Sequence, residues 1–227
     1  MKRLTAVLGA APAPQGEWER EARFVSTAAL RTPGRPVAEV AGELATRLRG
    51  VPGVAKVDVR PNGFLVIEVA VPGEIVREIL DAPPPEGGRR DLPEPWPDFP
   101  RTWGNPGFVV RYAYVRAGAV GRWARGLGMP DAEGFPAEAL DDPSDRAVLR
   151  VLAELPSRRA SRDPGWPAYL ERLAEAYHDA FEHAPPLPKG DEGFSGAHLA
   201  RVRLAEAVRR VLGEGLGELG VVPPGKI

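Results

Sequence analysis

The stretch FVVRYAYVRAGAVGRWARGL, residues 108–127, is the segment that decides the fold. Its apolar residues recur at the spacing of three and four that is typical of an amphipathic helix, and Gly128 and Pro130 then end it. Three later segments repeat this pattern: 145–160, where Pro156 ends or kinks the helix, 167–182, and a helix capped by Ser195 that runs to Leu216. Four helices with short connections predict an all-α, antiparallel helical bundle over residues 105–227.

The first 81 residues show a different pattern. Alternating residues at 54–59 and 64–69 flank the turn Pro61-Asn62-Gly63, which is the signature of a β-hairpin. Helical periodicity precedes the hairpin at 36–50 and follows it at 74–80. The sequence therefore predicts a small α+β domain over residues 1–81.

Residues 82–104 are rich in proline and glycine and predict a linker of partly polyproline character. We expect its aromatic residues Trp96, Phe99 and Trp103 to lie against a neighbouring surface. Two domains joined by a proline-rich strap are thus expected.

Composition excludes several classes of function. The 227 residues carry a formal net charge of −1, which argues against a protein coated in positive potential. The absence of cysteine rules out disulfides and thiolate-bound metals, and three histidines, of which His178 and His183 are five residues apart, favour no metal site. We predict no cofactor, no catalytic residues, no membrane association and a cytoplasmic location, because no apolar run is long enough for a membrane span or a secretory signal.

One glycine pattern resembles a phosphate-binding loop. Residues 215–220 read GLGELG, but a dinucleotide-binding loop follows a strand and opens a helix, whereas this segment ends a helix. We interpret it as a helix terminus.

Arginine placement is the remaining functional signal. Of 30 basic residues only four are lysines, and the segment 108–127 carries four arginines and no carboxylate. Guanidinium groups suit phosphate recognition, and aromatic side chains stack on unpaired bases. The candidate nucleic-acid contacts are Arg111, Tyr112, Tyr114, Arg116, Arg201, Arg209 and Arg210. The alternative for each arginine is a solvated helix face, and for Tyr112 the bundle core.

Residues 105–117, NPGFVVRYAYVRA, resemble the opening helix of the C-terminal anticodon-binding (DALR) domain of arginyl-tRNA synthetases. The motifs around Asp145-Arg146, Tyr169-Leu170 and 203–221 resemble the later helices of that domain in the same order. Tyr114 stands where the family has a histidine. The family ends near a side chain that meets the anticodon loop, which makes Ile227 a further candidate contact.

Residues 22–71 resemble the N-terminal appended domain of the same enzymes. In that family a Rossmann-type catalytic domain separates the two parts, and its His-x-Gly-His and Lys-Met-Ser-Lys-Ser signatures do not occur in these 227 residues. The resemblance therefore implies a synthetase paralogue that lacks the catalytic domain and is not an enzyme.

The leading hypothesis is a non-catalytic protein that binds the anticodon arm of tRNA, and a preference for arginine tRNA is a further prediction. The alternative is a protein-interaction or regulatory module that has lost RNA binding and recognises a partner or a second copy of itself. A third hypothesis is a subunit that supplies tRNA affinity to a separate catalytic chain.

Overall fold

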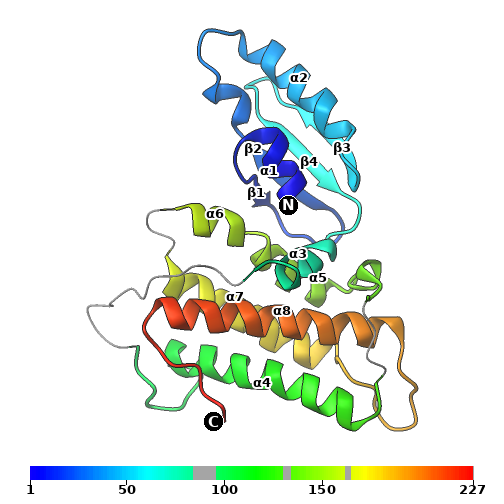
Figure 1. The fold of residues 1–227 in the computed structure, drawn as a ribbon, viewed down its shortest axis with the longest axis vertical. Coiled ribbons are helices and arrows are strands. Elements are labelled where there is room, and N and C mark those ends of the chain that lie inside the picture. Colours follow the sequence, from blue (N-terminus) through cyan, green and yellow to red (C-terminus); the bar gives the residue numbers. More distant parts are fainter. Residues whose placement is uncertain (84–95, 130–133, 162–164, 227) are drawn as a thin grey trace.

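The computed structural model describes residues 1–83, 96–129, 134–161 and 165–226. A small antiparallel sheet with three helices forms the N-terminal part, and the rest is mostly helical (Figure 1). The sheet and helix α4 lie at opposite ends of the long axis of the molecule. This arrangement confirms the coarse prediction of an α+β part followed by a helical part.

The sheet has four strands in the order β1-β2-β4-β3, and every neighbouring pair is antiparallel. The strands are β1 (Ala13–Gln15), β2 (Ala22–Ser26), β3 (Val54–Val59) and β4 (Leu65–Val69). Phe24 of β2 and Ile67 of β4 are register partners and are both fully buried, so the core of this part lies under the two central strands. The rings of Trp18 and Phe24 pack edge to face with 5.1 Å between the ring centroids.

The predicted hairpin between β3 and β4 is confirmed, and its turn explains why glycine is needed there. Gly63 has a φ of 80°, which is the left-handed region, and the Asn62 side chain accepts a hydrogen bond from the Phe64 N–H. A Cβ on Gly63 would lie 2.2 Å from Cγ1 of Val37, because the start of α2 packs directly on this turn.

Three helices accompany the sheet: α1 (Lys2–Leu8), α2 (Val37–Arg49) and α3 (Glu74–Leu80). Helix α2 buries Val40, Ala41, Ala45 and Leu48, at the spacing predicted from the sequence, and it contacts β3 and α1. The predictions of α2 and α3 are confirmed. Two short 3₁₀ turns, η1 (Ala28–Arg31) and η2 (Ala137–Ala139), complete the loops.

The C-terminal part contains α4 (Pro106–Gly126), α5 (Pro143–Leu152), α6 (Leu155–Ala160), α7 (Trp166–His183) and α8 (Gly196–Glu218). Side chains of Asn105, Asp142 and Ser195 cap α4, α5 and α8 by accepting a backbone N–H of the first turn. Proline in the first turn of α4, α5 and α7 fixes the φ angle where no N–H is needed.

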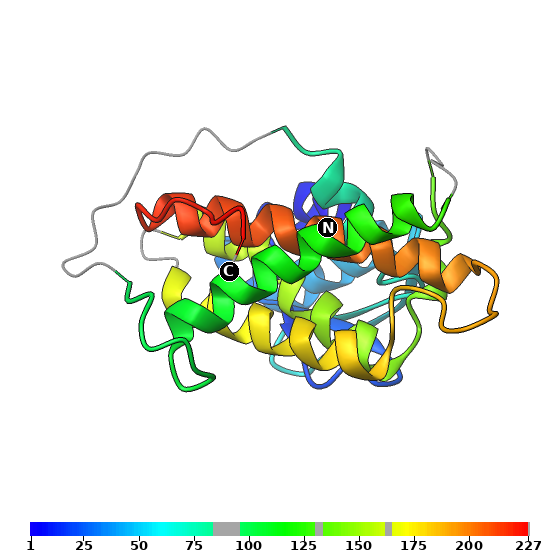
Figure 2. The same cartoon turned by 90° about the horizontal axis from the view of Figure 1, so that it is seen from below.

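Helices α4 and α8 lie side by side and run in opposite directions (Figure 2). A Cβ on Gly213 would meet the Tyr114 ring at 3.0 Å, and a Cβ on Gly118 would meet the Arg209 guanidinium at 2.9 Å. The earlier position on α4 thus meets the later position on α8, as expected for antiparallel helices. Glycine at these two positions lets a large side chain of the partner helix lie against the backbone.

The end or kink predicted at Pro156 is confirmed, because the predicted segment 145–160 forms two helices. The sequence predicted a helix over 145–160, whereas the structure has α5 ending at Leu152 and a separate α6 beginning at Leu155. Pro156 lacks an N–H and its ring would clash with the carbonyl group of Leu152, so the chain turns before the proline, which then occupies the first turn of α6.

The two parts share one hydrophobic core, and arginines of the helical part hold the N-terminal part in place. Arg146 of α5 donates to the carbonyl oxygens of Trp18 and Arg20, at 3.3 and 2.9 Å. Arg150 donates to the carbonyl of Gly16 at 2.7 Å. Figure 1 shows α3 and α5 between the sheet and the α7–α8 layer.

The predicted linker over 82–104 lies partly outside the described residues. In residues 96–104, Trp96 is partly buried, as expected, but Phe99 is 69% exposed and Trp103 is 61% exposed. The prediction that all three aromatic side chains are held on a surface is therefore wrong for Phe99. Over the part of the chain that the structure describes, no helix combines the length and the apolar character needed to span a bilayer.

Candidate nucleic-acid interface

Arg111, a predicted nucleic-acid contact, lies in the interior, where it is 9% exposed. Its guanidinium donates hydrogen bonds to the carbonyl oxygens of Trp96, Pro97 and Gly107, at 3.0, 3.1 and 2.9 Å. The side chain therefore fastens residues 96–97 to the first turn of α4.

Arg201 is also engaged inside the protein. Its Nε donates to the Asp145 carboxylate at 2.9 Å, and the guanidinium reaches the carbonyl of Pro185 at 3.3 Å. Asp145 is 1% exposed, and burial raises its pKa to about 6 although the hydrogen bond from Arg201 acts in the opposite direction. The pair connects α5 to α8.

Arg210 connects α8 to the end of α3. It donates to the carbonyl oxygens of Leu80, at 2.8 Å, and Ala82, and it pairs with Glu214 at 3.1 Å. Arg111, Arg201 and Arg210 thus all donate to backbone carbonyl groups of this chain.

Tyr112 and Arg116 lie together on the side of α4 that faces α7. Arg116 pairs with Glu182 at 3.3 Å and lies over the rings of Tyr112 and Phe181, at 4.8 and 4.5 Å from the ring centroids. Tyr112 itself stacks on Phe108 with 5.7 Å between the ring centroids. Tyr112 is half-buried and lies outside the hydrophobic core, so the alternative of a bundle-core position does not describe it.

Tyr114 and Arg209 meet on the other side of α4. The Arg209 guanidinium lies 5.0 Å from the Tyr114 ring centroid and donates to its hydroxyl at 3.4 Å. Arg209 is exposed, and within the described residues it has no carboxylate partner. The predicted residues therefore lie in several separate places, and Ile227 lies outside the described residues. Their role as nucleic-acid contacts stays a prediction.

Two arginines that the site prediction did not include extend the Tyr114–Arg209 pair. Tyr114, Gly118, Arg122 and Arg125 follow one another at intervals of four, four and three residues and so share one face of α4. We call this face, together with Arg209 of α8, the α4 basic face. Helical spacing within the segment 108–127 was the signal that would have found it.

The α4 basic face has an unbalanced positive charge. Arg122 and Arg125 are exposed, and no described carboxylate lies in ion-pair distance of either. Helix α4 itself has no acidic residue, and the acid nearest to Arg209 along α8, Glu206, pairs with Arg203 at 2.9 Å. Trp123, half exposed, follows Arg122 on the adjoining face and offers an aromatic surface beside it.

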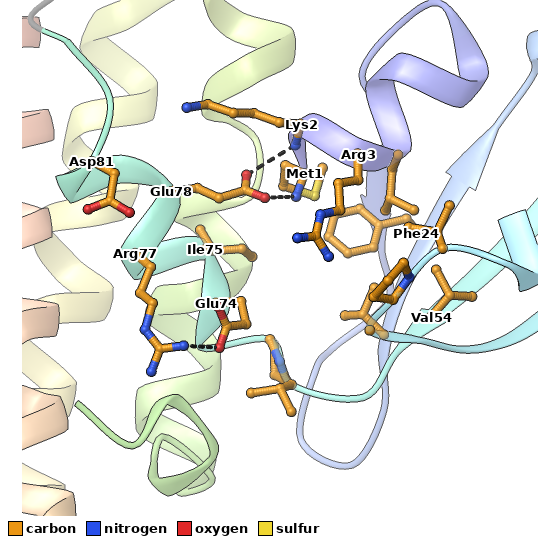
Figure 3. A pocket seen from close by; sticks show the side chains of 17 residues that line it. Met1, Lys2, Arg3, Phe24, Val54, Glu74, Ile75, Arg77, Glu78 and Asp81 are labelled. Atoms are coloured by element: carbon orange, nitrogen blue, oxygen red, sulfur yellow. Dashed lines mark hydrogen bonds and ion pairs between the residues drawn. The ribbon is translucent and has the colours of Figure 1, made fainter. Parts of the chain in front are cut away.

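A cavity of about 570 Å³ lies between α1, α3 and the sheet (Figure 3). Phe24, Val54 and Ile75 contribute apolar walls, and two ion pairs lie on its rim. Glu78 accepts from the Met1 amino group at 2.6 Å, and Glu74 accepts from Arg77. With four cationic groups and three carboxylates, the lining has a formal charge of only +1, which is too small to favour a polyanion.

The three histidines have separate surroundings. His178 is buried, His183 bonds to the carbonyl of Asp179, and His198 completes the capping box of α8. No group of three or more metal-ligating side chains occurs within the described ranges.

The model of the DALR anticodon binding domain matches residues 110–227, which is just over half of the chain. The chain belongs to the DALR anticodon-binding domain family. The match begins within α4 and includes every residue of the α4 basic face.

Two curated relatives named arginine–tRNA ligase are each 39% identical to this chain. The Clavibacter sepedonicus protein aligns over 129 residues, 55% of this chain and 23% of the relative, and the Frankia alni protein over 130 residues, 55% and 24%. The DALR chain thus spans about a quarter of the length of these relatives.

Proposed function

We propose that this DALR-family chain binds tRNA without catalysing aminoacylation, and that it holds the anticodon arm on the α4 basic face. The observation that carries the proposal is the cluster of Arg122, Arg125 and Arg209, three exposed guanidinium groups without carboxylate partners in the described part of the chain. Unneutralised guanidinium groups on one face bind phosphates, and Tyr114 and Trp123 beside them suit unpaired bases.

Two further features support the proposal. The relatives are named for ligation of arginine to tRNA, and the family is named for anticodon binding. Residues 22–71, which resemble the appended domain, belong to the N-terminal part at the end of the molecule away from α4. The short connection between the two parts, and the missing class I signatures, support a role in binding rather than in arginine activation.

The salt dependence of tRNA binding tests this proposal. Each phosphate contact contributes about 0.7 to the slope of log K against log salt concentration for a single strand. Three contacts alone give roughly a 20-fold loss of affinity between about 50 and 200 mM salt. Removing two of them, with Arg122→Ala and Arg125→Ala, should lower that slope by about 1.4 and leave the fold intact.

The control is Lys189→Ala, which removes an exposed cation from the α7–α8 loop. Binding measured by fluorescence anisotropy with unfractionated tRNA and with arginine tRNA separates general from species-preferring recognition. An equal slope for the double variant and the control contradicts the proposed face. Arginine-dependent exchange of pyrophosphate into ATP by the chain alone contradicts the non-catalytic role.

A second candidate function, recognition of another copy of this chain, is favoured by exposed apolar side chains near the C-terminal tail. Val222 is 85% exposed and lines a cavity of about 370 Å³ with Trp96 and Arg101, and Arg101 lies over the exposed Phe99 ring. Sedimentation velocity of the chain and of Phe99→Ala tests this function. A concentration-dependent dimer lost in Phe99→Ala supports it, and a monomer at every concentration contradicts it.

A further inference from the structure

Another cavity lies on the opposite flank of α4, against α7, and has a volume of about 490 Å³. Arg116 of α4 and Glu175, His178, Asp179 and Glu182 of α7 line it, and Trp103 stands at its edge. Arg116 is two residues from Tyr114, so the two side chains leave the helix about 200° apart. The cavity is therefore separate from the α4 basic face.

The charge of this cavity is negative. Glu175, Asp179 and Glu182 follow one another at intervals of four and three residues and share one face of α7. Arg116 is the one cation of the lining and pairs with Glu182, whereas Glu175 and Asp179 have no ion-pair partner among the described residues. The lining has a formal charge of −2, which disfavours a phosphate and favours a cation.

A buried acceptor in the wall has no donor. His178 is 7% exposed, and its Nε2 lies 3.2 Å from the carbonyl oxygen of Val109. Because a carbonyl oxygen only accepts, Nε2 carries the hydrogen and Nδ1 presents a lone pair, which has no hydrogen-bond partner. Burial lowers the pKa of His178 to about 4, so the ring is neutral near pH 7. His178 therefore adds no positive charge to the lining of the cavity.

An exposed indole completes the lining. Trp103 is 61% exposed, and its ring meets His178 and Tyr112 edge to face, with centroid distances of 4.9 and 5.7 Å. These neighbours hold one edge of the ring while much of its surface remains open to solvent. The face of an indole attracts organic cations more strongly than those of the other aromatic side chains.

We propose that the α4–α7 cavity binds a small organic cation that carries N–H donors, of the alkylguanidinium or alkylamine class. The cation donates N–H hydrogen bonds to the carboxylates of Glu175 and Asp179 and lies against Trp103. The volume of the α4–α7 cavity is in the range of small-molecule sites in proteins. This site is additional to the proposed RNA interface and does not depend on it.

Isothermal titration of the full chain with agmatine, putrescine and choline tests the proposal. Agmatine and putrescine carry N–H donors, whereas choline is a cation without them. We expect saturable binding of agmatine or putrescine that is at least 10-fold tighter than binding of choline. No saturable binding of either amine, or equal binding of choline, overturns the proposal.

Variants locate the binding. Glu175→Gln with Asp179→Asn, and separately Trp103→Ala, should weaken the interaction at least 10-fold. Arg122→Ala, on the other flank of α4, should leave it unchanged and is the matched control. The nitrogen NMR signal of His178 Nδ1 should move on saturation with the amine. An unmoved signal, or equal weakening in Arg122→Ala, contradicts the site.

Discussion

Replacing Arg111 with alanine should destabilise the protein without weakening its binding to RNA. The guanidinium is nearly buried and donates to three carbonyl oxygens, those of Trp96, Pro97 and Gly107. The Gly107 carbonyl keeps its helical partner, the backbone N–H of residue 111. The variant therefore leaves two carbonyl oxygens, on Trp96 and Pro97, without this donor.

The size of the effect follows from these two bonds. A hydrogen bond from a charged group contributes about 1.5–3 kcal/mol, and water partly replaces the donor because both carbonyl groups are only partly buried. We expect the free energy of unfolding to fall by about 2–4 kcal/mol. In a chain of this size that corresponds to a decrease in melting temperature of roughly 5–12 °C.

Urea unfolding followed by circular dichroism measures the loss, with Arg122→Ala as the control. That arginine is exposed on the same helix and should change the free energy of unfolding by less than about 0.5 kcal/mol. If Arg111→Ala is as stable as the control, or if the folded variant loses tRNA affinity, Arg111 contacts RNA instead of fastening the strap.

Two further predictions concern stability. Since burial raises the pKa of Asp145 from 3.8 to about 6, the folded state holds this proton more tightly than the unfolded state. The stability of the wild type relative to Asp145→Asn should therefore fall by up to about 3 kcal/mol between pH 4 and 6 and then level off, and a flat difference in urea titrations would contradict this. At the end of α8, Gly217→Ala has open space and should raise the free energy of unfolding by about 0.5–1 kcal/mol. Gly215→Ala would place a Cβ 2.5 Å from Cδ2 of the buried Leu170 and should lower it by roughly 1–3 kcal/mol, which thermal melts of the two variants compare.

Periodicity identified the elements whose environment is one-sided. Helices α2, α4, α7 and α8 and the β3–β4 hairpin each bury one face, so their patterns predicted them. Strand β1 has only three residues, too few to show alternation, and the sequence did not reveal it. The glycine pattern at 215–220 lies at the end of α8, with Gly220 in the left-handed region after the last turn, which confirms its interpretation as a helix terminus.

The partners of the arginines could not be predicted because they come from distant parts of the chain. Arg210 bonds to the carbonyl of Leu80, 130 residues away, and Arg201 pairs with Asp145, 56 residues away. A pattern within one helix carries no information about partners at such sequence separations. Among the residues that the structure describes, Arg122 and Arg125 have no such long-range partner, but in the sequence they look the same as Arg111 and Arg116.

Helix α4 shows why the count of charges on a helix does not give the charge of a surface. Helix α4 has four arginines and no acidic residue. However, Arg111 donates its hydrogen bonds to carbonyl oxygens, and Arg116 forms an ion pair with Glu182 of α7. Arg122 and Arg125, together with Arg209 of α8, make one flank of α4 positive. The acidic residues of α7 make the other flank negative. Because the charge is opposite on the two flanks of α4, we expect an RNA ligand to respond to variants of α4 and a cationic ligand to respond to variants of α7. Neutralising Arg122 and Arg125 should affect only the first, and neutralising Glu175 and Asp179 should remove the second.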